Sequence, residues 1–112
     1  MKDSIILATN NGLGIAEIAL QHKLAVKYFE LLAQNNELPS AICFYTDGVK
    51  LTVTDSPVLE QLKVLEEKGV RLIVCSTCLD HYGIKDKLQI GIIGGMTDII
   101  EAQTKASKVI TI

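Results

Sequence analysis

Large aromatic side chains are almost absent from this sequence: it has no tryptophan, and aromatic residues make up only 4% of the chain. The interior must therefore be built from Ile, Leu, Val and Ala, in a chain that is 48% hydrophobic. A core of that kind suits a β-sheet covered by helices. A chain of 112 residues is long enough for one such core and too short for two. We therefore expect residues 1–112 to form a single domain.

Runs of like charge and long apolar stretches are also missing. The 13 acidic and 11 basic residues are scattered along the chain, so no basic patch indicates nucleic acid. The longest apolar stretches, such as Ile5–Ala8 and Ile90–Ile93, are far shorter than the roughly 18 residues that span a bilayer. The first residues also lack the apolar segment of a secretory signal. The sequence thus predicts a cytoplasmic protein with no nucleic-acid and no membrane partner.

What the sequence does contain is an alternation of short β-favouring runs with helical patterns. Strands are expected at residues 4–9, 41–45, 70–74, 90–93 and 108–112, and helices at residues 14–34, at 57–68 and from about 97. Ser56 is expected to cap the second helix, with Pro57 at its first position, and Gly69 is expected to end it in the left-handed conformation. Gly83 is expected to stop a helical turn that follows Cys78. Residues 49–54 are expected as extended loop or a short strand. Alternating strands and helices form right-handed crossovers. The sequence therefore predicts a three-layer α/β/α domain with a mostly parallel five-stranded sheet.

Three expected loops follow strands and should meet at one edge of this sheet: Asn10–Gly14, Thr46–Lys50 and Cys75–Cys78. In such sheets, ligands bind outside the carboxyl ends of the strands. Gly12-Leu13-Gly14 resembles a phosphate-binding loop in outline, but position 17 is Glu17 where a dinucleotide fingerprint has its third glycine. These glycines therefore predict a turn and not a nucleotide site.

Two of the three cysteines lie at that edge, separated by two residues. Cys78 should lie close to the start of a helix, where the exposed amides and the dipole favour the thiolate. A thiolate attacks a disulfide, accepts a sulfane sulfur as a persulfide, or binds metal. Cys75 ends an apolar strand, where a cysteine can equally serve as a small packing residue. Cys43 lies in the middle of an apolar strand and is expected in the core.

Polar neighbours could support a reactive Cys78. Ser76 and Thr77 offer hydroxyls and amides that could hydrogen-bond a thiolate or a persulfide. His81 could assist deprotonation of Cys78 or remain solvated, and Lys50 could attract an anionic sulfur species or help hold a thiolate. Asp47 and Asp80 could line the same edge.

Cys75, Cys78 and His81 could be three ligands of a zinc site, with a water or a partner in the fourth position. A structural zinc site usually has four protein ligands, and the chain offers no second pair. We therefore expect neither a metal nor a cofactor.

Three stretches follow one another in register along the chain: Asp47–Thr52, Leu65–Val70 and Cys75–Gly83. Together they resemble the DsrE-like domain of YedF-type proteins, which are sulfurtransferase-like proteins linked to selenium metabolism. The most specific stretch is Cys75-Ser76-Thr77-Cys78-Leu79-Asp80, and the resemblance covers nearly the whole chain. It implies a DsrE-type α/β sandwich, commonly a homo-oligomer, in which a cysteine carries sulfur as a persulfide. The matching position is Cys78, with Cys75 as its neighbour. Such proteins resemble carriers between donor and acceptor proteins more than enzymes that turn over a small molecule.

Three hypotheses follow from these residues. The first is a sulfur relay, in which Cys78 takes sulfane sulfur (or selenium) from a donor protein and passes it on, and Cys75 resolves it by forming a disulfide. The second is a dithiol redox protein that uses the same pair without sulfane sulfur. The third is a non-catalytic oligomeric binding module in which the cysteines are incidental.

Overall fold

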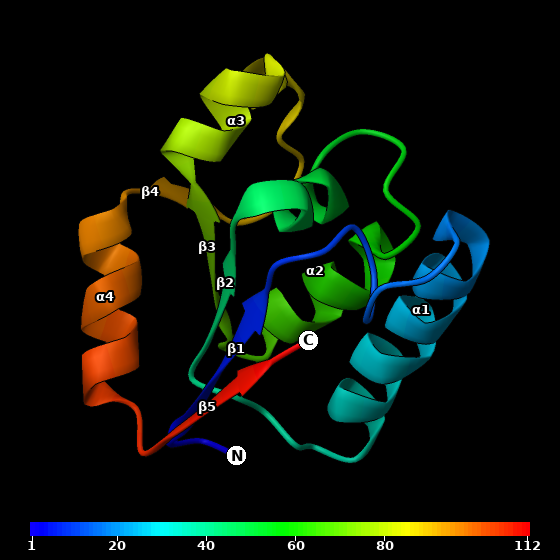
Figure 1. Cartoon of the computed structure of the whole chain (residues 1–112). Coiled ribbons are helices and arrows are strands. Elements are labelled where there is room, and N and C mark those ends of the chain that lie inside the picture. Colours follow the sequence, from blue (N-terminus) through cyan, green and yellow to red (C-terminus); the bar gives the residue numbers. More distant parts are fainter.

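The computed structural model describes every residue, Met1–Ile112, and contains one five-stranded sheet (Figure 1). All strand pairings are parallel, in the order β4-β3-β2-β1-β5. This confirms the predicted α/β fold with its five-stranded parallel sheet. The strands are β1 (Ser4–Ala8), β2 (Ala41–Phe44), β3 (Arg71–Cys75), β4 (Ile92–Gly94) and β5 (Lys108–Thr111). The α-helices are α1 (Ile18–Gln34), α2 (Leu59–Glu67), α3 (Ser76–Tyr82) and α4 (Met96–Lys105), and the short 3₁₀ helices are η1 (Thr46–Thr52) and η2 (Lys85–Lys87).

The connections between strands place helices on both faces of the sheet. The chain steps from β1 to β4 in one direction across the sheet, so right-handed connections put α1 and α2 on the same face. The α4 connection returns from β4 to β5 at the opposite edge and therefore lies on the other face. Figure 1 shows α1 and α2 on one side of the strands and α4 on the other. These are the three layers that the sequence predicts.

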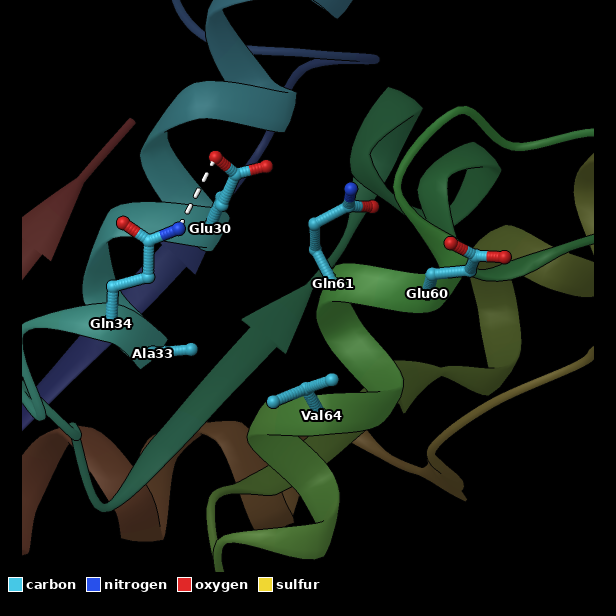
Figure 2. Close-up of a pocket in the computed structure, with 6 residues that line it drawn as sticks. All are labelled: Glu30, Ala33, Gln34, Glu60, Gln61 and Val64. Atoms are coloured by element: carbon cyan, nitrogen blue, oxygen red, sulfur yellow. Dashed lines mark hydrogen bonds between the residues drawn. The ribbon is translucent and has the colours of Figure 1, made fainter.

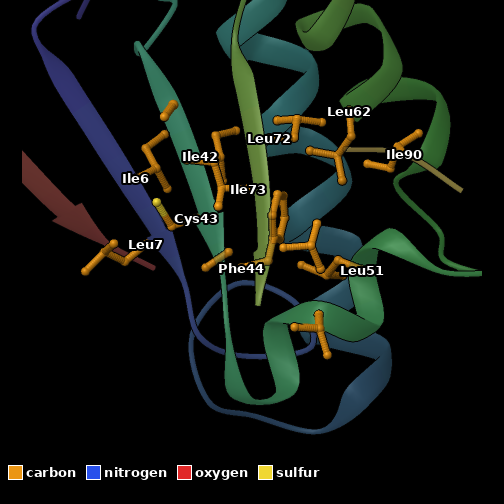
Figure 3. Close-up of a cluster of buried hydrophobic side chains, with 14 of the residues drawn as sticks. Ile6, Leu7, Ile42, Cys43, Phe44, Leu51, Leu62, Leu72, Ile73 and Ile90 are labelled. Atoms are coloured by element: carbon orange, nitrogen blue, oxygen red, sulfur yellow. The ribbon is translucent and has the colours of Figure 1, made fainter. Parts of the chain in front are cut away.

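The core lies mainly between the sheet and the α1 and α2 layer (Figure 3). Ile6, Ile42 and Leu72 are partners on adjacent strands and face Leu62 of α2. The cluster contains 25 buried residues, nearly all of them aliphatic. Cys43 is among them at 0% exposure, which confirms its prediction as a core residue.

Apolar residues at helical spacing give each long helix one buried stripe. In α1 this stripe is Ala25, Phe29 and Leu32, and in α2 it is Leu62 and Leu65. None of the helices combines the length and the apolar character that crossing a bilayer would require.

Helix α1 begins at Ile18, four residues later than the predicted start at Gly14. The preceding loop folds back on the helix instead of joining it. The Leu13 N–H donates to the Gln21 carbonyl at 3.0 Å, and the Gln21 side chain donates to the Gly14 carbonyl at 2.7 Å. These hydrogen bonds hold Gly12–Gly14 in a turn that packs against the first turn of α1 and is not part of the helix.

Helix α2 also begins later than predicted. The expected cap at Ser56 with Pro57 in the first turn is wrong by two residues, because Val58 is the residue that precedes the helix. The Ser56 hydroxyl instead accepts the Val58 N–H at 3.2 Å, which closes a turn just before α2. At the other end Gly69 has φ of 98°, the left-handed conformation that ends the helix as predicted.

The segment after β2 is the largest departure from prediction. The sequence predicts extended loop or a short strand at residues 49–54, but residues 46–52 form η1. The apolar residues Val49, Leu51 and Val53 alternate in the sequence as in a strand, but Gly48 and Thr52 are buried as well, so the burial itself does not alternate. No ladder forms there beyond a single antiparallel bridge between Val53 and Leu88.

Smaller differences occur at the later elements. β4 comprises Ile92–Gly94 and not residues 90–93, and α4 begins at Met96 and not at residue 97. The expected loop at Cys75–Cys78 does not exist, because β3 ends at Cys75 and α3 begins at Ser76. Gly83 ends α3 in the left-handed conformation, as predicted.

Candidate functional site

The carboxyl ends of β1, β2 and β3 lie side by side at one edge of the sheet. Ala8, Phe44 and Val74 are partners in register, and β3 continues to Cys75 before turning directly into α3. The segments that follow these strands therefore meet at the edge, as predicted. They bring the start of η1 against the first turn of α3, where Cys78 lies.

The Cys78 sulfur forms a hydrogen bond across this edge. The backbone N–H of Thr46, the first residue of η1, donates to Cys78 Sγ at 3.1 Å. Cys78 is half-buried, so its sulfur is both supported from one side and open to solvent on another. This places the thiol where an incoming sulfur compound can reach it.

A glycine brings η1 close enough for that contact. A Cβ atom built on Gly48 would lie 1.8 Å from the Ala8 carbonyl oxygen and 2.6 Å from the Ala8 carbonyl carbon. No side chain fits in that space, so glycine is required at this position. The close approach seats the η1 turn on the end of β1 and holds Thr46 beside α3.

Cys75, the second cysteine at this edge, lies where β3 meets α3. It is the last residue of β3 and only 2% exposed, and its thiol interacts with that of Cys78. The pair is therefore asymmetric, with one reachable sulfur and one buried sulfur.

Burial raises the pKa of the Cys78 thiol above its ordinary value, and the nearby Cys75 thiol adds to the increase. The Thr46 amide acts in the opposite direction but does not outweigh burial. The expectation that the start of a helix lowers this pKa is therefore wrong. Desolvation of the half-buried sulfur decides the direction of this pKa shift.

A polar cluster lies beside the thiol, built from η1 and the last turn of α3. The Tyr82 hydroxyl donates to Asp47 Oδ1 at 2.5 Å, and Lys50 Nζ lies 3.1 Å from the same oxygen and 4.4 Å from the centre of the Tyr82 ring. The Tyr82 hydrogen bond, followed by the Lys50 contact, lowers the pKa of Asp47. The same hydrogen bond raises the pKa of Tyr82, and the charge of Cys78 contributes to that increase.

The other predicted site residues lie around α3. The Ser76 hydroxyl accepts a hydrogen bond from Lys85 Nζ at 3.0 Å and makes none with Cys78. Thr77 is exposed, and His81 is exposed and contacts the Tyr82 ring edge to face at 5.4 Å. Lys50 binds Asp47 and Tyr82, as described above. The structure thus places Cys75 and Cys78 at the junction of β3 and α3, and the predicted polar side chains make their contacts with other residues and not with the thiols.

No group of three or more His, Cys, Asp or Glu side chains is arranged to hold a metal ion, so Cys75, Cys78 and His81 do not meet as ligands. The structure's cavities also lie elsewhere. The cavity in Figure 2, of about 270 Å³, lies between α1 and α2 and is lined by residues such as Glu30, Gln61 and Val64. Because no cavity includes Cys75 or Cys78, the thiol edge is a surface site and not an enclosed pocket.

Native alkylation is expected to modify Cys78 first and Cys43 last. Cys43 is fully buried, and burial raises its pKa to about 11. The thiolate is the form that reacts with the alkylating agent, and the pKa of Cys78 is raised. The rate of Cys78 alkylation should therefore keep increasing as the pH rises through the range in which ordinary thiols ionise. Peptide mass spectrometry after timed iodoacetamide treatment measures each site. In denaturant all three should react at similar rates, and faster native labelling of Cys43 than of Cys78 would contradict the arrangement.

Sequence reasoning missed two participants, the Thr46 amide and Tyr82. Tyr82 lies four residues after Cys78, so both side chains are on one face of α3. That spacing could have identified Tyr82. The Thr46 amide could not have been found in the same way, because a backbone donor leaves no mark in the residue type.

The fold and this edge together define a small α/β protein with a cysteine-based surface site. A sequence model of the DsrE/DsrF-like family matches residues 5–112, and the chain belongs to this family. A comparison with curated protein sequences finds no match.

Solved structures share the fold. The ychN protein from E. coli is 22% identical, with a TM-score of 0.74 over 100% of both chains. MTH1491 from Methanobacterium thermoautotrophicum, described as a protein of unknown function, is 21% identical, with a TM-score of 0.69 over 97% of this chain and 98% of its own. BT1422 from Bacteroides thetaiotaomicron, a conserved protein of unknown function, is 17% identical, with a TM-score of 0.68 over 97% of this chain and 93% of its own.

Proposed function

We propose that this protein is a sulfur carrier, in which Cys78 accepts a sulfane sulfur as a persulfide and passes it to an acceptor protein. The observation that carries the proposal is the half-buried Cys78 sulfur, bonded by the Thr46 N–H at the open carboxyl edge of the sheet. Sulfur relay is also the general role of the DsrE/DsrF-like family. The lack of a pocket around the thiol favours delivery by another protein over capture of a small substrate.

The transfer is an exchange of one sulfur atom. The Cys78 thiolate attacks the outer sulfur of a persulfide on the donor protein, and a new S–S bond forms at Cys78. The S–S bond of the donor breaks, and the donor cysteine leaves as a thiolate and takes up the proton that Cys78 released. An acceptor thiolate then attacks the outer sulfur on Cys78 in the same manner, so no external oxidant or reductant is needed.

Cys75 offers a second exit for the sulfur. Its thiolate can attack the inner sulfur of the Cys78 persulfide, which forms a Cys75–Cys78 disulfide and releases hydrosulfide. The position of Cys75 at the end of β3, directly before the first turn of α3 that carries Cys78, supports this step. The same arrangement favours the alternative of a dithiol redox protein, in which both thiols give up two electrons and two protons to a disulfide oxidant.

The partners we propose are a donor and an acceptor protein, together with further copies of this chain. Exposed apolar side chains support self-association, among them Ile15 at 91% exposure and Ile92 at 58%. The proposal of a YedF-type role, with sulfur or selenium as the cargo, rests on the resemblance of Asp47–Thr52, Leu65–Val70 and Cys75–Gly83. The proposal of a cytoplasmic location rests on the shortness of the apolar stretches.

The test is to expose the reduced protein to a protein persulfide donor and to measure its cyanide-labile sulfur and intact mass. The carrier proposal predicts a gain of labile sulfur. No gain, with ready formation of an intramolecular disulfide, would favour the redox alternative. No gain with slowly alkylating thiols would favour a binding module.

A further inference from the structure

We infer that Thr46 is a positioning residue for Cys78, whose left-handed backbone holds its N–H on the sulfur while the sulfur is attacked and discharged. This inference rests on the proposed sulfur-carrier function. It assigns a role to a residue of η1 that lies 32 positions away from Cys78 in the sequence.

The backbone of Thr46 is in an unusual conformation. Its φ is 49°, and the only other non-glycine residues with positive φ are Asn36 and Asp55. Asn and Asp tolerate the left-handed region, whereas a β-branched threonine disfavours it strongly. Such a conformation persists only where the surroundings impose it, and it concentrates at functional sites.

The surroundings that impose it come from the end of β1. The Thr46 hydroxyl lies 2.7 Å from the Thr9 carbonyl oxygen and 2.7 Å from the Tyr45 carbonyl oxygen, so it donates its one proton to this pair of acceptors. The Tyr45 N–H donates to the Ala8 carbonyl at 3.2 Å, and Gly48 packs against the same residue. The turn is thus fixed on both sides of Thr46.

The result of this conformation is an amide that points at sulfur. The Thr46 N–H reaches Cys78 Sγ at 3.1 Å, and it opposes the effect of burial on the thiol. Negative charge is present on this sulfur when Cys78 attacks and again when the persulfide is discharged. A donor that is fixed in advance stabilises that charge without reorganisation. Because the donor is a backbone group, the side chain of Thr46 acts only through the conformation that it maintains.

Two substitutions separate the conformation from the hydroxyl group. Thr46→Val keeps the β-branch and loses the bond to Thr9, so the backbone should leave the left-handed region and the N–H should turn away. Native alkylation of Cys78 at pH 8 should then slow by about tenfold, and its pH profile should move to higher pH. Thr46→Gly lacks the same hydroxyl but adopts positive φ freely, so it should rescue the rate to within about twofold of the wild type. Thr104→Val, on α4, is the matched control for the loss of a threonine hydroxyl.

The inference is overturned if Cys78 of the Thr46→Val protein is alkylated with the wild-type rate and pH profile. It is also overturned if Thr46→Gly slows the alkylation of Cys78 as much as Thr46→Val does. If circular dichroism shows Thr46→Val to be unfolded, NMR of the wild-type protein decides. There the Thr46 amide proton resonance should shift with pH at the midpoint of Cys78 alkylation, and a resonance that does not follow Cys78 overturns the inference. Both readouts report on the thiol alone, whereas failure of the carrier function appears as an absence of sulfur uptake.

Discussion

The Cys78→Ser protein is expected to take up no labile sulfur from a persulfide donor, whereas Cys75→Ala should take up as much as the wild type. A serine hydroxyl forms no persulfide, and the remaining thiols cannot replace Cys78. Cys75 is 2% exposed and Cys43 is 0% exposed, so neither sulfur can be reached by a cysteine on another protein. Cyanide-labile sulfur, measured after removal of the donor, gives the comparison directly.

Cys75→Ala is the matched control, since it also removes one thiol from the same edge. Without Cys75 there is no resolving thiol, so the persulfide on Cys78 should persist longer and release less hydrosulfide. If Cys78→Ser gained as much labile sulfur as the wild type, Cys78 would not be the carrier. If Cys75→Ala lost uptake completely, the two cysteines would have to act as a unit.

The second large effect is expected from Gly48→Ala, which should lower the free energy of unfolding by about 2–3 kcal/mol. The added methyl group would lie 1.8 Å from the Ala8 carbonyl oxygen, and backbone atoms cannot move aside as a flexible side chain can. The η1 turn must therefore shift away from β1. Urea denaturation measures the loss of stability. The same shift carries Thr46 away from Cys78, so native alkylation of Cys78 should change as well.

Gly95→Ala provides the control for this substitution. A Cβ atom on Gly95 meets nothing within 4 Å, and its φ of −102° suits any residue. Its effect on unfolding should be under about 1 kcal/mol. If the Gly48→Ala and Gly95→Ala proteins unfolded at the same urea concentration, the close approach of η1 to β1 would not stabilise the fold.

The fold could be predicted because its strands are short apolar runs between clear breaks. Ser4–Ala8 and Ala41–Phe44 are fully buried, as expected for central strands of a parallel sheet. The position of Cys75 and Cys78 at the carboxyl edge followed from the same topology. Gly69 and Gly83 marked helix ends correctly, because a left-handed residue closes both α2 and α3.

The segment after β2 could not be predicted, because its pattern is ambiguous. Val49, Leu51 and Val53 alternate as in a strand, but the segment folds into η1. The close packing of Gly48 against the Ala8 carbonyl and the hydrogen bond of the Thr46 hydroxyl to the Thr9 carbonyl stabilise this turn. The raised pKa of Cys78 was also out of reach. It depends on how deeply the sulfur is buried, which a motif does not encode.

The polar cluster of Asp47, Lys50 and Tyr82 is another feature that the sequence could not fully predict. The sequence predicts Asp47 and Lys50 as edge residues, but both also contact Tyr82, which lies 35 residues after Asp47 along the chain. The charge of Lys50 therefore interacts with the Asp47 carboxylate and with the face of the Tyr82 ring. Only the packing of η1 against α3 reveals this.

The most direct test of the sulfur-carrier account is to locate the added sulfur by tandem mass spectrometry. Cleavage after Arg71 and Lys85 yields one peptide that contains both Cys75 and Cys78, and Cys43 lies on a separate peptide, Tyr28–Lys50. After treatment with a persulfide donor and trapping by alkylation, fragment ions should place the additional sulfur on Cys78. A protein that carries the additional sulfur on Cys43 or Cys75, or that carries none at any site, would contradict the account.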